Sequence, residues 1–115
     1  MAISFESIGQ KLVSFKAASG LAVGDVCIVS ANDTVAAASA NGEFCGVVSG
    51  IRAGVAGVIL GGCVTVPYTG ETAPSVGYCA LAADGDKGVT VKTGATSRLV
   101  VHVDTTNETV TFFLN

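Results

Sequence analysis

The chain has 115 residues, of which 50% are hydrophobic and only 13% are charged, and its formal net charge is −3. The negative charge and the lack of a Lys/Arg cluster argue against nucleic acid as a ligand, because contacts to phosphates need concentrated positive charge. Fifteen glycines, no tryptophan and many Ala and Val residues favour short strands and tight turns over helices.

Residues 1–10 lack the basic start and the apolar core of a signal peptide. No stretch of the chain is long and apolar enough to cross a bilayer, so we expect neither export nor a membrane partner. So few charges also indicate that part of the surface is covered. A homo-oligomer or a docking partner would cover it.

Residues 1–20 differ in character from the rest, and their pattern supports two interpretations. Ile8, Leu12 and Phe15 have the spacing of one helix face, whereas the alternation over residues 11–17 fits a strand. The residues leave both interpretations open.

A third interpretation treats Ala2 to Gly9 as an extended arm that becomes ordered only against a partner. Its apolar residues precede the regular β pattern, which begins at Leu21. We therefore expect residues 1–20 to form an N-terminal arm or first element, and residues 21–115 to form a single β domain.

From Leu21 the pattern predicts strands and turns. A turn at Gly24-Asp25 precedes a strand over residues 26–30, and a return strand over residues 34–38 follows an Asp-containing turn. Asn41-Gly42 is a strong tight-turn signal. It leads into the most apolar part of the chain.

That apolar part runs from Gly42 to Val66. We expect two buried strands in it, over about residues 44–49 and 55–66, joined by a turn at residues 50–54. Glycine within a strand marks a bend or a bulge. The second strand is therefore expected to curve sharply, as in a small barrel, at Gly57, Gly61 and Gly62.

Pro67 ends this segment, and an echo of an earlier pattern follows. The pattern of residues 22–29 recurs 53 residues later in residues 75–82, and each copy continues into an acidic turn and another strand. Two similar hairpins in one barrel or sandwich would explain the echo. Chance similarity in a chain so rich in Ala, Val and Gly is the alternative.

The C-terminal residues form the clearest unit. Apolar residues alternate with others over residues 99–103 and 110–114, on either side of a polar loop at residues 104–108. This predicts a terminal β-hairpin. The fold class is therefore all-β: a small β-barrel or β-sandwich with Gly-rich curved strands, an N-terminal extended arm and a C-terminal β-hairpin.

Four cysteines, at spacings of 18, 18 and 16 residues, form no CxxC or Cys/His pair. Zinc binding is therefore not expected, and no metal or other cofactor is predicted. Because each lies among apolar residues, we expect four buried, reduced thiols, with one or two disulfides as the alternative. They are Cys27, Cys45, Cys63 and Cys79.

No catalytic constellation is evident, and we expect no enzyme activity. His102 is the only histidine, and its strand context predicts a surface residue rather than a base. The segment 84–88 is too short for a calcium loop. It would place Lys87 on a tight turn, as in a lipoyl or biotin carrier domain, but a solvated turn is the simpler interpretation.

Four segments share a pattern of turn glycines and β-strand valines: Val23 to Ala36, Gly42 to Val48, Gly57 to Pro67 and Val76 to Gly85. Together they resemble the small capsid decoration, or cement, proteins of tailed bacteriophages. The resemblance spans about residues 21–103.

The resemblance implies a non-enzymatic β protein on the outer surface of the virion, made in the host cytoplasm. It also implies a homo-oligomer, with a trimer favoured, that reinforces joints between major capsid protein subunits. An N-terminal arm often contributes shell contacts in that family, so Ile3, Phe5 and Ile8 are the hypothetical capsid contacts. The four cysteines and the Phe-rich C-terminal hairpin depart from the family.

The alternative function is a non-catalytic β binding module. It could be a carrier-type hairpin domain or a virion protein that contacts carbohydrate. An exposed aromatic cleft would favour the carbohydrate function.

Overall fold

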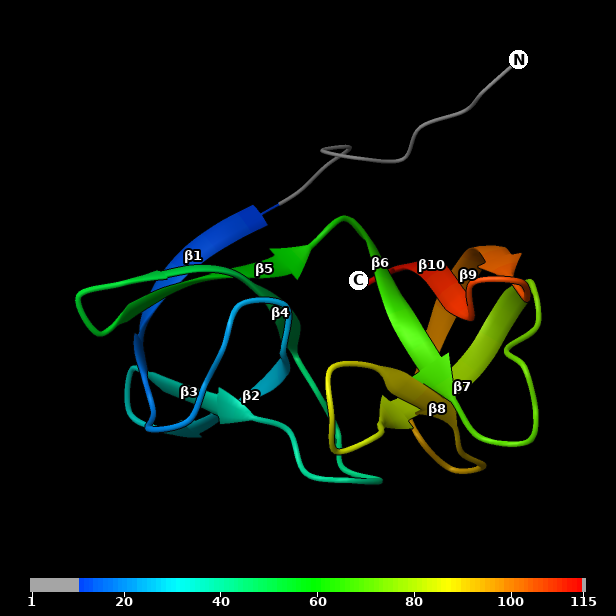
Figure 1. The fold of residues 1–115 in the computed structure, drawn as a ribbon, viewed down its shortest axis with the longest axis horizontal. Coiled ribbons are helices and arrows are strands. Elements are labelled where there is room, and N and C mark those ends of the chain that lie inside the picture. Colours follow the sequence, from blue (N-terminus) through cyan, green and yellow to red (C-terminus); the bar gives the residue numbers. More distant parts are fainter. Residues whose placement is uncertain (1–10, 115) are drawn as a thin grey trace, which may run out of the picture.

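The computed structural model describes residues 11–114, which form ten β-strands in two closed barrels. The barrels lie side by side along the longest axis of the molecule (Figure 1). The first contains β1 (Lys11–Ala17), β2 (Val26–Ala31), β3 (Thr34–Ala37), β4 (Gly46–Arg52) and β5 (Val55–Gly61). The second contains β6 (Cys63–Thr69), β7 (Gly77–Ala83), β8 (Val89–Val91), β9 (Ser97–Asp104) and β10 (Thr109–Phe113). The all-β prediction and the barrel architecture are confirmed.

The strand interpretation of residues 11–17 is confirmed, and the helix interpretation is wrong for these residues. β1 pairs antiparallel with β5 over most of its length. Its last two residues also pair in parallel with β3, where Lys16 faces Thr34 and Ala17 faces Val35. These pairings satisfy backbone groups that a helix would have satisfied internally.

The central apolar stretch differs from its prediction in three respects. Its last strand does not end at Pro67, because β6 continues through that residue to Thr69. Its turn is narrower than predicted, because only Ala53 and Gly54 separate β4 from β5. Both residues have positive φ, 52° and 79°, which suits the backbone twist of a two-residue hairpin. The second predicted strand is split by Gly62, whose φ of 89° favours glycine. The chain passes there from β5 of the first barrel to β6 of the second.

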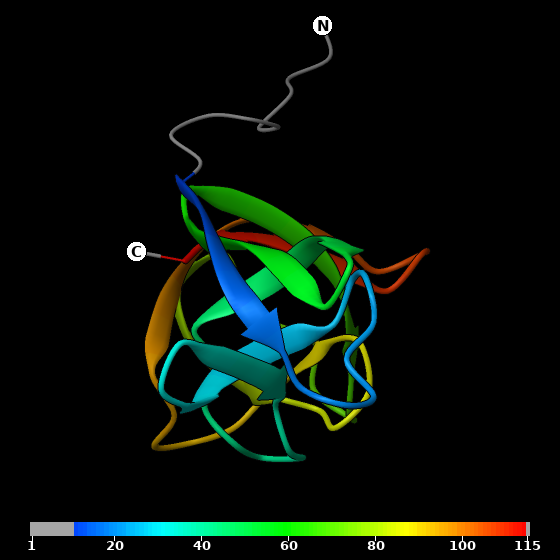
Figure 2. The ribbon, with the colours of Figure 1, turned by 90° about the vertical axis from the view of Figure 1, so that its left-hand side faces the viewer.

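The two barrels share one topology. The strand order around the first is β1-β3-β2-β4-β5, and the second runs β6-β8-β7-β9-β10, closing on itself in the same way. The parallel pair β1–β3 is matched by the parallel pair β6–β8. Figure 2 shows the first barrel end-on. The echo therefore reflects one hairpin in each of two barrels, and the expectation that both hairpins lie in one barrel is wrong.

The register repeats as well as the strand order. Cys27 faces Gly46 between β2 and β4, and Cys79 faces Arg98 between β7 and β9, each 52 residues later. β4 carries a register shift beside Val48, and the β9–β10 ladder shifts beside Val100, also 52 residues on. The predicted C-terminal hairpin is β9–β10 and is confirmed.

The loop between β3 and β4 ties the barrels together. The Asn41 amide donates to the Ala83 carbonyl at 2.8 Å, and the Ala83 amide donates to the Gly42 carbonyl at 2.9 Å. Phe44, at the end of this loop, packs edge-to-face on Phe112 of the second barrel, with 5.9 Å between ring centroids. This aromatic contact contributes beyond its buried area.

Candidate docking face

One outward row of side chains crosses four strands of each barrel. Residues paired across neighbouring strands point to the same face, so each row is one continuous surface. The first-barrel row consists of Leu12, Ile59, Val47 and Val26. The second-barrel row consists of the equivalent residues Cys63, Phe113, Leu99 and Tyr78.

The Val26 end of the first-barrel row is covered within the chain. Val26 is 1% exposed and Val47 is 9% exposed. Both belong to the core cluster that holds the second barrel's residues, whereas Cys27 and Val48 belong to the interior cluster of the first barrel. The contact between the barrels therefore buries this end of the row.

The same end of the second-barrel row is open. Tyr78 is 78% exposed, and its cross-strand partner Leu99 is 36% exposed. Their inward neighbours Cys79 and Val100 are buried. Side-chain alternation is thus the same in both barrels, and only the covering differs.

The opposite ends of the two rows show the reverse pattern. Leu12 at the far end of the first row is 64% exposed, whereas Cys63 at the far end of the second row is 2% exposed. Val13 and Val55 in the first barrel are exposed as well, although Val13 points to the opposite face of β1 from Leu12 and Val55 pairs with Lys16 at the other end of that strand. The chain therefore presents two apolar surfaces of different kinds, the Leu12 end of one row and the Tyr78 end of the other.

A groove accompanies the Tyr78 end. Its volume is about 370 Å³, which is within the range that holds a small ligand or an inserted side chain. We call it the Tyr78 groove. It is lined by Tyr78, Ser97, Arg98, Leu99, Phe113 and Leu114.

Arg98 supplies the charge of this groove. One guanidinium nitrogen, Nη2, donates to the Phe44 carbonyl at 2.7 Å, and Nη1 donates to the Leu114 carbonyl. The guanidinium also lies over the Phe44 ring, 4.5 Å from its centroid. Burial lowers the pKa of Arg98, but arginine stays protonated in proteins. A fixed positive charge therefore lies beside the apolar surface, while its Nε finds no acceptor among residues 11–114.

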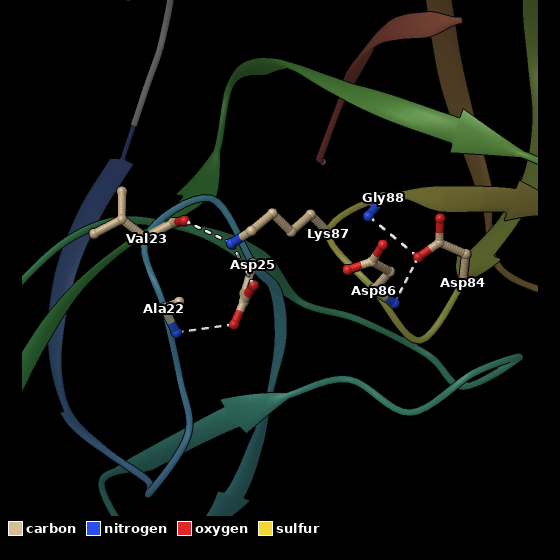
Figure 3. A network of polar contacts seen from close by, with 7 residues as sticks. All are labelled: Ala22, Val23, Asp25, Asp84, Asp86, Lys87 and Gly88. Carbon is tan, nitrogen blue, oxygen red and sulfur yellow. Dashed lines mark hydrogen bonds and ion pairs between the residues drawn. The ribbon is translucent and has the colours of Figure 1, made fainter.

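Lys87 joins the two barrels through a polar network (Figure 3). Its ammonium lies 3.1 Å from Asp25 Oδ1 and 3.1 Å from the Val23 carbonyl. The other Asp25 oxygen accepts from the Ala22 amide at 2.8 Å. A carrier lysine must reach a modifying enzyme, so these two acceptors oppose that use of Lys87.

The turn that holds Lys87 is organised by a carboxylate. Asp84 Oδ1 accepts from the amides of Asp86 and Gly88 at 2.8 and 3.2 Å. This arrangement is an Asp-stabilised turn. Within residues 11–114 no group of three His, Cys, Asp or Glu side chains is placed to hold a metal ion.

Other residues singled out in the sequence are placed as follows. His102 lies exposed on β9, opposite Thr111. The four cysteines carry thiols rather than disulfides, but Cys45 is only half-buried, so the expectation of four buried thiols is wrong for that residue. The predicted arm at residues 2–9 lies outside the described residues, and with it the hypothetical contacts Ile3, Phe5 and Ile8.

The described residues contain no helix that could span a membrane. Comparison with known protein families, curated proteins and solved structures finds no match for this chain. What the chain offers chemically is a pair of apolar surfaces on a duplicated scaffold. These surfaces are suited to docking.

Proposed function

We propose that this protein is a non-catalytic structural subunit that associates with copies of itself and binds the outer surface of a bacteriophage capsid. There it reinforces joints between major capsid protein subunits. It is made in the host cytoplasm and ends in the virion. The observation that carries the proposal is the open Tyr78 end, whose equivalent in the first barrel is buried by a neighbouring barrel.

The two exposed ends support self-association of one particular kind. A contact between the Leu12 end of one copy and the Tyr78 end of the next joins two different surfaces, so it is heterologous. Heterologous contacts close into rings when the rotation between copies permits it. A trimer is the ring favoured by the resemblance to decoration proteins.

Attachment to the capsid rests on the resemblance, supported by the composition. A chain with 13% charged residues and several exposed apolar side chains has surface to bury against a partner. Ile3, Phe5 and Ile8 remain the proposed capsid contacts. Burying one such side chain contributes about 1.5–3 kcal/mol.

Co-sedimentation with capsids tests this function. Expanded heads of a phage that encodes the chain, prepared without it, should carry the full-length protein into the pellet. Deleting residues 2–9 should weaken attachment by about tenfold or more while leaving the melting temperature nearly unchanged. Failure of the full-length protein to bind such heads at micromolar concentration would contradict the proposal.

A second candidate function is contact with carbohydrate. Tyr78 is an exposed aromatic ring at the edge of a groove, and aromatic faces stack on apolar surfaces of ligands. Titration with capsule or cell-wall oligosaccharides would reveal it through shifts of the Tyr78 ring resonances. Unchanged resonances would remove this candidate.

A further inference from the structure

We propose that Cys27 and Cys45 form a redox modification site, a dithiol that a small disulfide such as oxidised glutathione converts to a disulfide. The site adjoins the Tyr78 groove through Arg98, but it does not depend on the proposed function. It is carried by the placement of the two residues and by a comparison with the second barrel.

The two cysteines are neighbours on adjacent chain segments. Cys27 lies on β2, and Cys45 immediately precedes β4, the antiparallel partner of β2. The Cys45 amide donates to the Cys27 carbonyl at 2.8 Å, and the two thiols lie close enough to shift each other's pKa. The Cys27 thiol also lies 3.5 Å from the Gly46 carbonyl. Neighbouring segments of this kind bring cysteines within the reach of a disulfide.

The two thiols have complementary reactivity. Cys45 is half-buried, so a small reagent can reach it, whereas Cys27 is fully buried. The hydrogen bond from Cys27 lowers the pKa of Cys45 to about 6, with help from the Val29 amide and the positive charge of Arg98. The same thiol–thiol hydrogen bond, together with burial, raises the pKa of Cys27. Cys45 is therefore the attacking thiolate at neutral pH.

The second barrel offers an internal comparison. Cys79 is the register equivalent of Cys27, and the position equivalent to Cys45 is occupied by Ser97. The first barrel thus holds two thiols at these positions and the second barrel a thiol and a hydroxyl. Ser97 is paired with Ala80 at the start of β9, whereas Cys45 lies just before β4. Only the first can form a disulfide. Cys79 is accordingly a matched control within the same molecule.

The chemistry is thiol–disulfide exchange in two steps. The Cys45 thiolate attacks one sulfur of oxidised glutathione, which forms a mixed disulfide and releases one glutathione thiolate. Cys27 then attacks the Cys45 sulfur, which forms the Cys27–Cys45 bond, and its proton passes to the leaving thiolate, which departs as the second glutathione. The protein loses two electrons and two protons, and the oxidised glutathione is reduced to two molecules of glutathione.

The bond would stiffen the connection between the barrels. It would close the loop from residue 27 to residue 45, which includes the hydrogen bonds to Ala83 and the Phe44 carbonyl held by Arg98. A cross-link of this kind restricts the unfolded chain. Oxidation should therefore raise the denaturant midpoint of unfolding.

The test uses the full chain incubated with oxidised glutathione at neutral pH. Thiols titrated after denaturation should fall from four to two, and the intact mass should fall by two hydrogens. Peptide mapping should join Cys27 to Cys45, and dithiothreitol should restore both the thiols and the original midpoint. Cys79→Ser should form the same bond, whereas Cys45→Ser should keep all three of its thiols.

Three results would overturn the proposal. One is the retention of four thiols after prolonged incubation, and another is a glutathione adduct on Cys45 that never resolves. The third is a disulfide that joins a different pair. Peptide mapping of the wild-type chain distinguishes these results even if a cysteine variant fails to fold.

Discussion

Val26 and Tyr78 occupy the same position in two barrels of one chain, 52 residues apart, yet Val26 is buried and Tyr78 is exposed. The difference comes from what lies against each barrel. The second barrel packs against the surface that holds Val26, and within residues 11–114 nothing equivalent covers Tyr78. The duplicated architecture thus contains one covered surface and one open surface at equivalent positions.

A substitution at Gly46 tests the close packing between β4 and β5. A Cβ at this position would lie 2.4 Å from the Ile59 carbonyl oxygen and 2.8 Å from a Val58 methyl group. We expect Gly46→Ala to lower the free energy of unfolding by about 2–3 kcal/mol in chemical denaturation, because the backbone must move. Gly50→Ala is the matched control, since no atom lies within 4 Å of its added Cβ. Equal stability of the two variants would contradict the packing described here.

A substitution at Arg98 tests the connection between the loop before β4 and the second barrel. Arg98→Met removes the donor to the Phe44 and Leu114 carbonyls and the contact with the Phe44 ring. We expect a loss of about 1–3 kcal/mol in the free energy of unfolding, because two partly buried carbonyls then lack donors. Arg52→Met, at an exposed position, should change stability by less than about 0.5 kcal/mol. A similar small change for both variants would show that Arg98 is not a structural tie.

A substitution at Lys87 tests how much the ion pair between the barrels contributes to stability. The Lys87 side chain is half exposed, so solvent screens its attraction to Asp25. We expect Lys87→Met to cost less than about 1 kcal/mol in thermal unfolding at low salt, and the cost should shrink at high salt. Lys16→Met on the exposed surface of β1 is the control. A larger, salt-independent loss would mean that the network is more strongly buried than its exposure indicates.

The pH dependence of alkylation tests the environment of Cys45. Because its pKa is lowered to about 6, its thiolate is already dominant at pH 7, whereas an ordinary cysteine titrates near 8.5. The rate of iodoacetamide labelling at Cys45 should rise through pH 6 and level off by about pH 7.5. The free energy of unfolding should change in the same direction with pH. The stabilisation from the Cys45 thiolate is complete above the pKa of an unfolded cysteine, and it is lost as the pH falls through 6. Labelling that rises only above pH 8 would contradict this environment.

The sequence predicts the local parts of this fold well. The strand over residues 26–30 corresponds to β2, and the alternation near the C-terminus corresponds to β9 and β10. The repeated pattern predicts a spacing of 53 residues, which holds for Gly24 and Gly77 with their positive φ values of 91° and 99°, whereas the strands that follow are related by 52 residues. Alternation and turn chemistry are local properties, so they can be read from the chain.

The closure into two barrels and the docking face could not be predicted in the same way. Closure depends on which distant strands pair, as β1 does with β5 and β6 with β10, and no local pattern specifies that choice. The exposure of Tyr78 depends on what covers β7 and β9. The sequence carries one signal of this exposure: the second copy of the repeated pattern has Tyr78 near the position that Val26 occupies in the first copy.

The most direct test of the central claim is sedimentation velocity on two charge-bearing variants, Tyr78→Glu and Leu12→Glu, measured separately and mixed. The wild-type chain should form a closed oligomer at high micromolar concentration, and each variant alone should be a monomer, because each lacks one end of the proposed contact. The mixture should form a dimer, since the intact Leu12 end of one variant meets the intact Tyr78 end of the other. Val29→Glu, an exposed change on β2 outside the two rows, should remain oligomeric. A wild-type monomer, or a mixture that stays monomeric, would contradict the head-to-tail contact.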